Sequence, residues 1–383
     1  MNVLILGAGM MGRAIAYDLS LFSGFEQIIL SDKDSQTRRS AKNFLKGTNV
    51  DIIPINADKS NDLKKHFQKV DVVISAVPYQ FNFKLAKMAI ETKTHFVDLG
   101  GNNTIVENER SLFSKAKKSN VTIIPDSGLA PGLVSIITRD IVDRMDTVDS
   151  VKLRVGGLPR HPKAPLNYQI VFSPYGLINE YVEDAIILNH GKILKKKSMT
   201  DVESLKFPEP FGMMEAFLTS GGCSTLPFTY KNTIGYLDYK TIRYPGHCEK
   251  IKMFLDFGFA NETKLNIKGH SIIPRDVFVT LLTKFVPTKG EDVVLLKVIS
   301  QGTKNGKKRL REYLMIDYYD TKHNITAMMR TTGYPVAIIA QMLENGMIQE
   351  RGVFCPEEII RPTLFFAELK KRNIMLSISD RSV

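Results

Sequence analysis

The sequence has few cysteines and no long apolar segment, and both shortages restrict what the protein can be. Cys223, Cys248 and Cys355 lie far apart with no CxxC or CxxxH spacing, which argues against a zinc site and against a disulfide framework. We therefore expect no metal, and a reducing cytoplasm as the compartment. No stretch approaches the roughly 20 apolar residues of a membrane-spanning helix. The N-terminus, Met1-Asn2-Val3, lacks a basic lead, so we expect no export signal.

Acidic residues are in the minority. The chain has 52 Lys and Arg against 40 Asp and Glu, a net charge of +12, which raises nucleic acid, acidic lipid or anionic small molecules as partners. The densest basic runs, at 195–197, 307–309 and 370–372, are short and lack interleaved aromatic residues. Such runs are typical of solvated surfaces. We expect neither a nucleic-acid partner nor a membrane partner.

The remaining composition is that of an ordinary globular protein. The chain has 383 residues, of which 43% are hydrophobic and 24% charged. At about 150 residues per domain, this length predicts two or three packed units with real hydrophobic cores.

A short apolar run at the N-terminus leads into a glycine-rich turn. Residues 3–6 are typical of a strand buried on both faces, and a helix-forming segment begins at residue 13. Between them stands Gly7-Ala8-Gly9-Met10-Met11-Gly12, which we predict to be the cofactor loop, its two methionines included. Gly7 would permit the tight turn, Gly9 the approach of a pyrophosphate, and Gly12 close packing of helix on strand. The helix N-terminus would donate N–H groups to the phosphates.

A carboxylate follows the second predicted strand. The apolar segment 27–30 leads to Asp32, 20 residues beyond Gly12, where an acid accepts hydrogen bonds from the ribose hydroxyls of NAD. A carboxylate also repels the 2′-phosphate of NADP, so Asp32 favours NAD. Lys33, Arg38 and Arg39 leave NADP open, because cations would attract that phosphate.

Strand and helix patterns continue to alternate up to residue 125. Residues 51–58, 70–78, 95–99 and 121–125 predict four further strands at the spacing of a doubly wound parallel sheet of the Rossmann type. Ligands bind off the carboxyl ends of such strands. We therefore expect Asp58 to contact the adenine, and Ala76, Val77 and Pro78 to pass the cofactor.

Motifs spread from Gly7 to Tyr334 resemble those of a known family. They are residues 7–19 (GAGMMGRAIAYDL), 77–78 (VP), 95–98 (HFVD), 126–132 (DSGLAPG), 156–159 (GGLP), 172–174 (FSP), 215–217 (EAF), 243–247 (RYPGH) and 331–334 (TTGY). In this order they resemble the saccharopine dehydrogenase-like family, in particular its lysine 6-dehydrogenase branch. The resemblance implies a nicotinamide-dependent enzyme that acts at a carbon–nitrogen bond of a lysine-like substrate. It also implies a homodimer or a higher homo-oligomer, and a dinucleotide domain interrupted by a substrate and dimerisation domain.

A change of pattern beyond residue 132 supports that division. A helix over 133–145 is followed by β-rich runs such as 151–155, 168–172 and 250–257, with prolines between them, which predicts a second, α+β unit. Residues 304–307 (KNGK) are typical of a hairpin tip, and 335–343 and 357–369 of helices. We predict an NAD-binding Rossmann domain over 1–132, an inserted substrate-binding and dimerisation domain over 133–326, and C-terminal helices over 327–383 that complete the first domain.

Oxidation of an amine requires a base, because a protonated nitrogen has no lone pair to assist hydride departure. His247 is one candidate, with a satisfied structural histidine as the alternative. Asp98 and Asp126 follow predicted strands at their carboxyl ends; they would bind the substrate's α-ammonium or act as base, unless they only cap turns. Lys240 is a candidate if desolvation lowers its pKa, and otherwise an exposed lysine.

Other residues are candidates for substrate binding. Arg243 is the predicted anchor of the substrate carboxylate, because a guanidinium binds a carboxylate through two hydrogen bonds. Polar groups near turns of the second domain would add hydrogen bonds: Tyr175, Glu180, Thr219 and Ser220. Thr331 precedes a predicted helix N-terminus, which would suit a carboxylate or phosphate, although N-capping explains it nearly as well.

These observations together favour NAD-dependent oxidative deamination of the ε-amino group of L-lysine. The products would be ammonia and 2-aminoadipate 6-semialdehyde, which cyclises to piperideine-6-carboxylate. A saccharopine reductase or a carboxynorspermidine-type dehydrogenase stays open; it would need a second cation, for which Arg154, Arg160 or Lys163 are candidates. A non-catalytic NAD-binding sensor also stays open, and would bind the cofactor without turnover.

Overall fold

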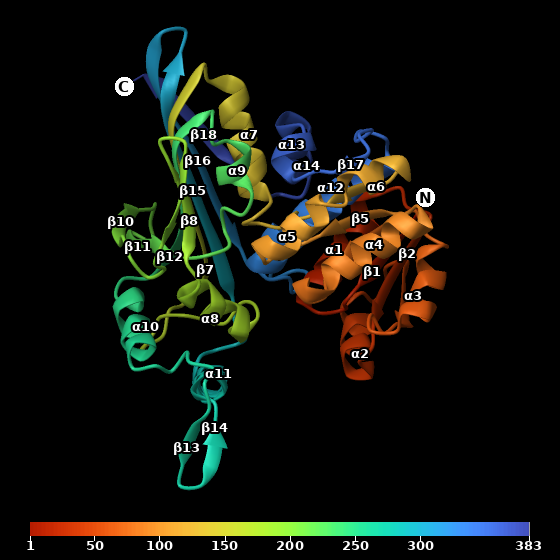
Figure 1. Cartoon of the computed structure of the whole chain (residues 1–383), viewed down its shortest axis with the longest axis horizontal. Helices are drawn as coiled ribbons and strands as arrows, with labels where there is room; N and C mark the ends of the chain where they lie inside the picture. The colour runs from red at the N-terminus through yellow and green to blue at the C-terminus, as the bar shows by residue number, and fades with distance from the viewer. Residues whose placement is uncertain (383) are drawn as a thin grey trace. The chain divides into compact units, whose positions relative to one another are not determined.

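The computed structural model describes residues 1–382 and divides into two compact units (Figure 1). The first unit comprises residues 1–143, 224–226 and 329–374, and the second comprises 144–223, 227–328 and the C-terminal strand. The division differs from the predicted boundaries at four points. Residues 133–143 and 224–226 belong to the first unit, whereas residues 327–328 and the last strand belong to the second unit.

A seven-stranded parallel sheet forms the centre of the first unit. Its strand order is β17-β6-β5-β4-β1-β2-β3, and every neighbouring pair is parallel. The strands are β1 (Asn2–Leu6), β2 (Gln27–Asp32), β3 (Val50–Pro54), β4 (Val72–Ser75), β5 (His95–Asp98), β6 (Thr122–Ile124) and β17 (Gly352–Val353). This 3-2-1-4-5-6 order is that of the doubly wound dinucleotide-binding fold, which confirms the predicted fold class.

Helices complete the first unit. They are α1 (Met10–Phe22), α2 (Ser35–Phe44), α3 (Ser60–Phe67), α4 (Asn82–Thr92), α5 (Asn103–Arg110), α6 (Phe113–Lys118), α7 (Leu133–Arg144), α12 (Ala327–Glu344), α13 (Pro356–Ile359) and α14 (Pro362–Lys371), with a short 3₁₀ turn at Tyr79–Phe81. The predicted helix at 335–343 in fact starts at Ala327, so Pro335 lies inside α12. The predicted helix at 357–369 is interrupted by Pro362, which starts α14.

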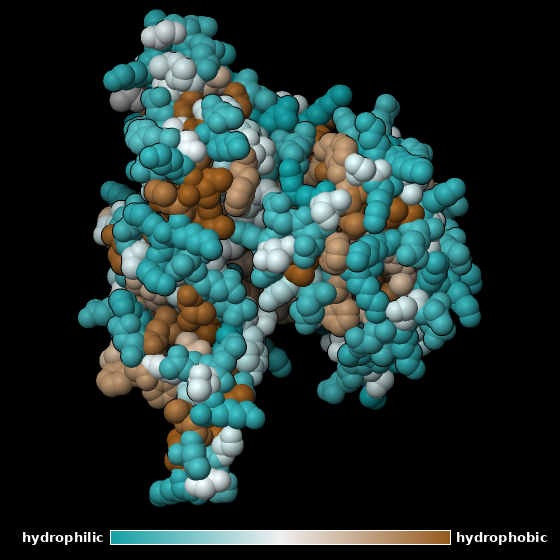
Figure 2. All heavy atoms as spheres, viewed as in Figure 1, coloured by the Kyte–Doolittle hydropathy of each residue, from teal (hydrophilic) through white to brown (hydrophobic). Residues whose placement is uncertain are grey.

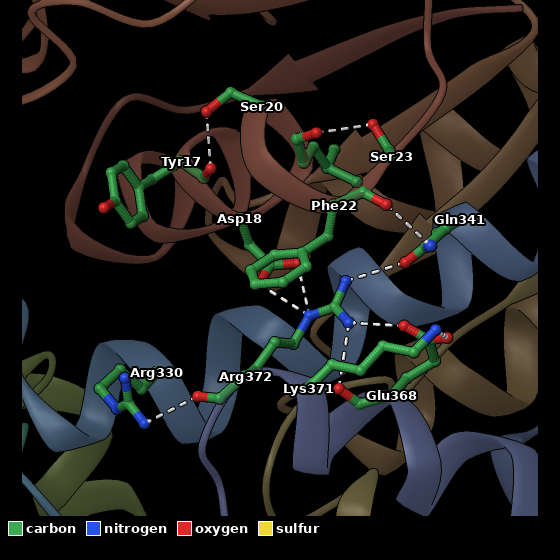
Figure 3. A network of polar contacts seen from close by, with 11 residues as sticks. Tyr17, Asp18, Ser20, Phe22, Ser23, Arg330, Gln341, Glu368, Lys371 and Arg372 are labelled. Carbon is green, nitrogen blue, oxygen red and sulfur yellow. Dashed lines mark hydrogen bonds and ion pairs between the residues drawn. The ribbon is translucent and has the colours of Figure 1, made fainter.

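A buried ion pair ties the C-terminal helices to α1 (Figure 3). Arg372 donates from Nε to both carboxylate oxygens of Asp18 at 2.8 and 2.9 Å, and neither side chain is exposed. The same guanidinium also reaches Glu368 and Gln341, each at 2.8 Å. The segment beyond the second unit is therefore an integral part of the first unit's core.

The second unit is built on a mixed nine-stranded sheet. Its main path is β10-β11-β12-β7-β15-β16-β18, and β8 pairs with β12 and β9. The strands are β7 (Thr147–Pro159), β8 (Ala185–Asn189), β9 (Lys192–Lys196), β10 (Glu203–Lys206), β11 (Met213–Leu218), β12 (Ile234–Arg243), β15 (Asp292–Lys304), β16 (Lys307–Tyr318) and β18 (Ser377–Ser382). Only β12 and β7 are parallel neighbours. The helices α8 (Pro174–Val182), α10 (His247–Asp256) and α11 (Pro274–Phe285) and a small hairpin, β13 (Leu265–Ile267) with β14 (His270–Ile272), complete the unit, and α9 (Leu226–Thr229) begins where the chain returns to it.

Two of the predicted strands of the second unit are wrong and the predicted hairpin is confirmed. Residues 250–257 lie almost wholly in α10, and residues 168–172 form no strand. Helix α10 forms because Glu215 on β11 accepts hydrogen bonds from its first backbone N–H groups, those of Gly246 and Cys248. The tip between β15 and β16 is Asn305-Gly306, both with positive φ, as a tight hairpin turn requires.

The surface and the helices can be checked for features that would bind a partner protein, a membrane or a metal. The face in Figure 2 is largely hydrophilic, with hydrophobic patches on the part that carries α10 and the β13–β14 hairpin. Exposed apolar side chains there include Phe257, Leu265, Ile267 and Phe285. Within residues 1–382 no helix is both long enough and apolar enough to cross a bilayer, and the same residues contain no group of three His, Cys, Asp or Glu placed to hold a metal.

Candidate functional site

The glycine turn between β1 and α1 has the geometry of a phosphate-binding loop. Gly7 has φ +98°, and a side chain on Gly12 would place its Cβ 1.7 Å from the carbonyl oxygen of Gly7, so both positions require glycine. Gly9 precedes α1, and nothing lies within 4 Å of a Cβ built there. This open space beside free helix N–H groups is where a pyrophosphate would lie. Met10 is partly exposed and Met11 is half-buried in the first turn.

Asp32 stands at the end of β2, beside this loop. Its carboxylate accepts hydrogen bonds from the backbone N–H groups of Ala8 and Asp34, both at 2.9 Å, which fixes its orientation. A pocket of about 190 Å³ lies against it. The lining includes Gly7, Asp32, Asp58, Val77, Pro78 and Phe81. Ala76 adjoins the loop as well, since its carbonyl oxygen lies 2.6 Å from a Cβ built on Gly7.

Two cations near Asp32 already have partners. The ammonium of Lys33 lies 3.3 Å from the carboxylate of Asp58. Nη1 of Arg38 donates to the backbone carbonyl oxygens of Asp32 and Lys33 at 2.8 and 2.9 Å. The two backbone acceptors fix the guanidinium of Arg38, whereas the pair of Lys33 with Asp58 is exposed, at 65% and 53% of the two side chains.

A cluster of buried carboxyl groups lies at the carboxyl ends of β5 and β6. Asp98 accepts a hydrogen bond from the N–H of Gly100 at 2.6 Å, and Asp126 accepts one from the hydroxyl of Ser224. Glu109 on α5 lies against Asp98, and neither of its carboxyl oxygens receives a hydrogen bond from a donor group. Oδ2 of Asp98 also receives no hydrogen bond from a donor group, so these carboxyl oxygens of Asp98 and Glu109 can bond each other only through a shared proton.

Burial determines the protonation of this cluster. Desolvation raises the pKa of Asp126 to about 8, opposed by the hydrogen bond from Ser224 and reinforced by the negative charge of Asp98. Desolvation also raises the pKa of Asp98 to about 6, and it raises that of Glu109 far above the usual range, with Asp98 adding to the effect. The cluster therefore holds protons at neutral pH and can exchange one there. Asp126 also has φ +59°, a conformation that non-glycine residues often adopt at functional sites.

In the second unit, Arg243 at the end of β12 is buried, with 3% of its surface exposed. Nε donates to the hydroxyl of Tyr181 at 3.1 Å, and Nη1 donates to the carbonyl oxygen of Ile242 at 2.9 Å. The guanidinium lies 4.7 Å from the ring centroid of Tyr168. Nη2 has no hydrogen-bond partner within residues 1–382, so the guanidinium keeps donor capacity for a ligand.

His247, four residues further on, is not placed as a base. Its Nε2 lies 3.1 Å from the hydroxyl of Tyr181 and its Nδ1 lies 3.2 Å from the carbonyl oxygen of Leu166. Burial, together with the charge of Arg243, lowers the pKa of the imidazole to about 3. Both ring nitrogens are therefore occupied and the ring is neutral.

The other predicted base of this unit, Lys240, is also occupied. Its ammonium donates to the carbonyl oxygen of Asp201 at 2.6 Å and to Glu203 at 3.1 Å. Glu203 is shared with Arg154, which is fully buried and binds both carboxylate oxygens of Asp238. Both contacts are structural, and they leave Lys240 poorly placed to act on a substrate.

Of the remaining predicted substrate residues in the second unit, Glu180 and Thr219 interact with residues of β12, whereas Tyr175 and Ser220 bond residues elsewhere. Glu180 is close enough to Arg243 for their charges to interact, and burial raises its pKa to about 7 against that cation. Thr219 bonds Thr241 on β12 at 2.7 Å. In contrast, Tyr175 is 47% exposed and bonds Asp276, and Ser220 reaches Glu183 at 3.4 Å.

Thr331, in the first unit, does not lie at a helix N-terminus. Helix α12 begins at Ala327, so Thr331 is inside it and fully buried. The predicted position before a helix N-terminus is therefore wrong, because the helix starts well before the proline expected to start it. A role of Thr331 in substrate binding stays a prediction.

Two family models match the chain. One, described as the saccharopine dehydrogenase NADP binding domain, matches residues 3–124. The other, the saccharopine dehydrogenase C-terminal domain, matches residues 128–374. The chain belongs to the saccharopine dehydrogenase family. Neither model distinguishes the lysine 6-dehydrogenase branch, which stays a prediction.

Three named relatives share 21–24% of their residues with this chain. Alpha-aminoadipic semialdehyde synthase of Rattus norvegicus is 24% identical over 95% of this chain, which spans 46% of the relative's length. The L-glutamate-forming saccharopine dehydrogenase [NADP(+)] of Pyricularia oryzae is 22% identical, and 93% of each chain is covered. Apo saccharopine dehydrogenase (L-Glu forming) of Saccharomyces cerevisiae has the same fold, with a TM-score of 0.82, 21% identity and 99% of each chain covered.

The saccharopine dehydrogenase family name fits a nicotinamide cofactor but does not confirm NAD. Both the matched NADP binding domain and the Pyricularia relative are named for NADP.

Sequence reasoning missed four side chains of the sites described above: Glu109, Tyr168, Tyr181 and Ser224. The one available signal was Glu109, which stands three residues after Val106 on the buried face of α5.

Proposed function

We propose that the protein is a nicotinamide-dependent oxidoreductase that oxidises a carbon–nitrogen bond of a lysine-derived amino acid. The observation that carries the proposal is the buried guanidinium of Arg243, whose Nη2 has no partner among the described residues. A buried cation with spare donors is suited to a carboxylate. Family membership supplies the reaction class, and the first unit has the glycine loop that such an enzyme needs.

The residues of each site have distinct roles in this proposal. Arg243 binds the substrate's α-carboxylate and Glu180, once ionised by that cation, attracts the α-ammonium. In the first unit, Asp126 is the residue that we propose to take up a proton during the reaction, because its pKa of about 8 lies near the working pH. The negative charge of Asp98 raises the proton affinity of Asp126. When bound, the nicotinamide accepts the hydride. Water then replaces the nitrogen at the oxidised carbon.

The cations of the second unit favour L-lysine, oxidised at its ε-carbon with release of ammonia, as the substrate. Saccharopine carries a second amino-acid end and needs a further cation. Arg154 is neutralised by Asp238 and Glu203, and Arg160 is paired with Glu291 at 2.9 Å. Of the three residues considered for that carboxylate, only the exposed Lys163 has no ion-pair partner among the described residues.

Saccharopine is the second candidate, and the relatives favour it. The Pyricularia and Saccharomyces proteins are both named for saccharopine oxidation that forms L-glutamate. On this scaffold the same carbon–nitrogen bond would be cleaved, with glutamate in place of ammonia as the product.

One assay separates these candidates. Purified protein is incubated at mildly alkaline pH with NAD or NADP and either L-lysine or L-saccharopine, and reduced nicotinamide is followed with ammonia and glutamate. Ammonia with L-lysine supports the lysine reaction, and glutamate with L-saccharopine supports the second candidate. Tight cofactor binding with no turnover of either compound would sink both and favour the sensor.

For the cofactor, we propose NAD. Asp32 is oriented by two backbone N–H groups beside the pocket, where its negative charge repels a 2′-phosphate. The nearby cations Lys33 and Arg38 are held by other groups. We expect kcat/KM for NAD to exceed that for NADP at least tenfold, and Asp32→Ser to reduce this preference. Equal use of both cofactors by the wild type would contradict the proposal.

We further propose that the protein is a cytoplasmic homodimer or a higher homo-oligomer. The three cysteines are free and buried, as suits a reducing compartment. Exposed apolar side chains of the second unit, among them Phe257 and Phe285, provide surface that association would cover. Light scattering after size exclusion tests this, and a monomer at micromolar concentration would refute it.

A further inference from the structure

Three buried side chains of the second unit are linked by hydrogen bonds in which the donor and the acceptor can each be assigned. Arg243 has no acceptor, so its Nε–H donates to the hydroxyl of Tyr181 at 3.1 Å. The hydroxyl then has its own hydrogen to donate, and Nε2 of His247 lies 3.1 Å away. The carbonyl oxygen of Leu166, 3.2 Å from Nδ1, can only accept. This series of hydrogen bonds therefore requires a neutral imidazole with its hydrogen on Nδ1.

The surroundings hold this series of hydrogen bonds in place from several elements. Arg243 ends β12, Tyr181 lies on α8 and His247 begins α10. The ring of Phe217 on β11 stacks on the imidazole with an interplanar angle of 9°, and the edge of Tyr168 contacts it at 5.2 Å between centroids. His247 and Tyr181 are 1% and 2% exposed. The rings therefore have little freedom to turn.

The charged groups near His247 oppose its protonation. Arg243 and Lys250 both act on it electrostatically as cations. Glu180 acts on Arg243 and Tyr181. A proton on His247 would also remove the acceptor that Tyr181 uses. The geometry and the charges agree on an uncharged histidine.

We propose that Tyr181 and His247 are positioning residues, which hold the guanidinium of Arg243 so that Nη2 is presented to the carboxylate of the substrate. This inference rests on the proposed function and deepens it. Nη1 donates to the carbonyl oxygen of Ile242 and Nε donates to Tyr181, and these two bonds fix the plane of the guanidinium. Nη2 is the nitrogen that remains for a ligand.

The test compares two diamines in Tyr181→Phe. L-Lysine carries the carboxylate and cadaverine is the same chain without it, and their binding is measured by calorimetry in the presence of NAD. We expect Tyr181→Phe to weaken L-lysine binding about tenfold, the factor for about 1.4 kcal/mol, and to leave cadaverine binding within twofold. Equal weakening of both diamines, or of neither, would overturn the positioning role. Failure of the wild type to bind L-lysine or L-saccharopine would instead overturn the proposed function, and with it the carboxylate as ligand.

Variants of His247 separate a positioning role from catalysis. Glutamine can accept from Tyr181 and donate to Leu166, so His247→Gln should keep L-lysine affinity within about threefold, while His247→Leu should behave like Tyr181→Phe. Both should keep the pH profile of kcat. Loss of kcat by a hundredfold or more in His247→Gln, as expected for a missing general base, would refute the proposal. His161→Gln, at an exposed histidine, is the matched control.

A spectroscopic measurement does not depend on turnover. The imidazole ¹⁵N signals of His247, assigned by difference from His247→Gln, should show one neutral tautomer between pH 5.5 and 8.5. Tyr181→Phe should shift the Nε2 signal alone. A signal that titrates near the ordinary histidine pKa of about 6.5 would overturn the proposal whatever the substrate is, and this holds even if Tyr181→Phe fails to fold.

Discussion

Gly9 and Gly12 belong to the same turn but respond very differently to a side chain. A Cβ at Gly12 would meet the carbonyl oxygen of Gly7, whereas one at Gly9 meets nothing within 4 Å. Gly9 also has φ −65°, which alanine adopts without strain. We predict that Gly12→Ala lowers the free energy of unfolding by about 1–3 kcal/mol or more, and that Gly9→Ala does not lower it. NAD binding should weaken in both, measured by calorimetry beside thermal unfolding. A Gly9→Ala variant with unchanged NAD affinity would contradict a pyrophosphate at this loop.

The buried carboxyl groups predict how stability depends on pH. Burial raises the pKa of Glu109 and Asp126 above their unfolded values, so the folded protein binds more protons than the unfolded chain at neutral pH. Their contribution to stability is fully present below about pH 4 and declines as the pH rises through the folded pKa. We predict that Glu109→Gln, which keeps the size and can donate to Asp98, flattens this decline between pH 6 and 9 by up to about 1.4 kcal/mol per pH unit.

Urea unfolding at pH 6 and pH 9 measures the difference. Glu107→Gln is the matched control, because Glu107 lies on the exposed face of the same helix. The control should lose stability with pH as the wild type does. Parallel pH profiles for Glu109→Gln and the wild type would show that Glu109 is ionised in the folded protein.

At the scale of elements, the contact of α14 with α1 depends on one arginine. Arg372 and Asp18 are both fully buried, and removing one partner leaves an uncompensated charge. We predict that Arg372→Met destabilises the protein by about 3–5 kcal/mol, and that the double variant Asp18→Leu/Arg372→Met recovers part of this loss. Chemical denaturation of the four proteins of the cycle gives the coupling energy.

Lys371 provides the control for that cycle. It neighbours Arg372 and pairs with Glu368, but 61% of its side chain is exposed, so Lys371→Met should change stability by less than about 1 kcal/mol. Additive single variants, with no recovery in the double variant, would mean that the pair contributes little.

The errors of sequence reasoning also occurred at the scale of elements. Apolar and polar residues largely alternate over 250–257, as they do in a strand. Glu215 on β11 nevertheless accepts hydrogen bonds from the N–H groups at the start of α10 and stabilises a helix there. Pro335 looked like a helix start, and the packing of Gly333 against Ala14, with a built Cβ 3.0 Å away, shows that α12 already lies on α1 before the proline. In both cases a contact distant in sequence overrode the local signal. The central strands β1, β4, β5 and β6 were predictable because nearly all of their residues are buried and their apolar runs are short and continuous.

Sequence patterns could indicate only those site residues that belong to a motif of known spacing. The glycine loop and Asp32 follow from spacing alone. Tyr181 is 62 residues from Arg243, and Ser224 is 98 residues from Asp126, so no local pattern links them. His247 and Lys240 attracted attention as titratable groups, and only the fold shows that their nitrogens are occupied.

At the scale of the whole molecule, the first unit is discontinuous. Residues 336–340 of α12 are fully buried in it, although the second unit separates them from the sheet in sequence. We predict that the fragment 1–143 alone shows no cooperative thermal unfolding. The same fragment joined to 329–374 by a flexible Gly/Ser linker should unfold cooperatively and bind NAD, with reduced stability because it lacks the bonds of Ser224 and Thr225 to Asp126 and Glu357. A fragment 1–143 that binds NAD by itself would contradict this.

The discontinuity of the first unit also has a consequence for synthesis. The ribosome completes residue 143 about 230 residues before it completes residue 374, which at ~5–20 residues per second takes roughly 10–45 s. During this interval the surface of α1 that will receive Arg372 and α12 has no partner, and Asp18 is exposed to water. Because an incomplete sheet with apolar faces is prone to aggregate, the nascent chain should depend on chaperones during this interval, and codons that slow translation of the second unit should lower the yield of folded protein.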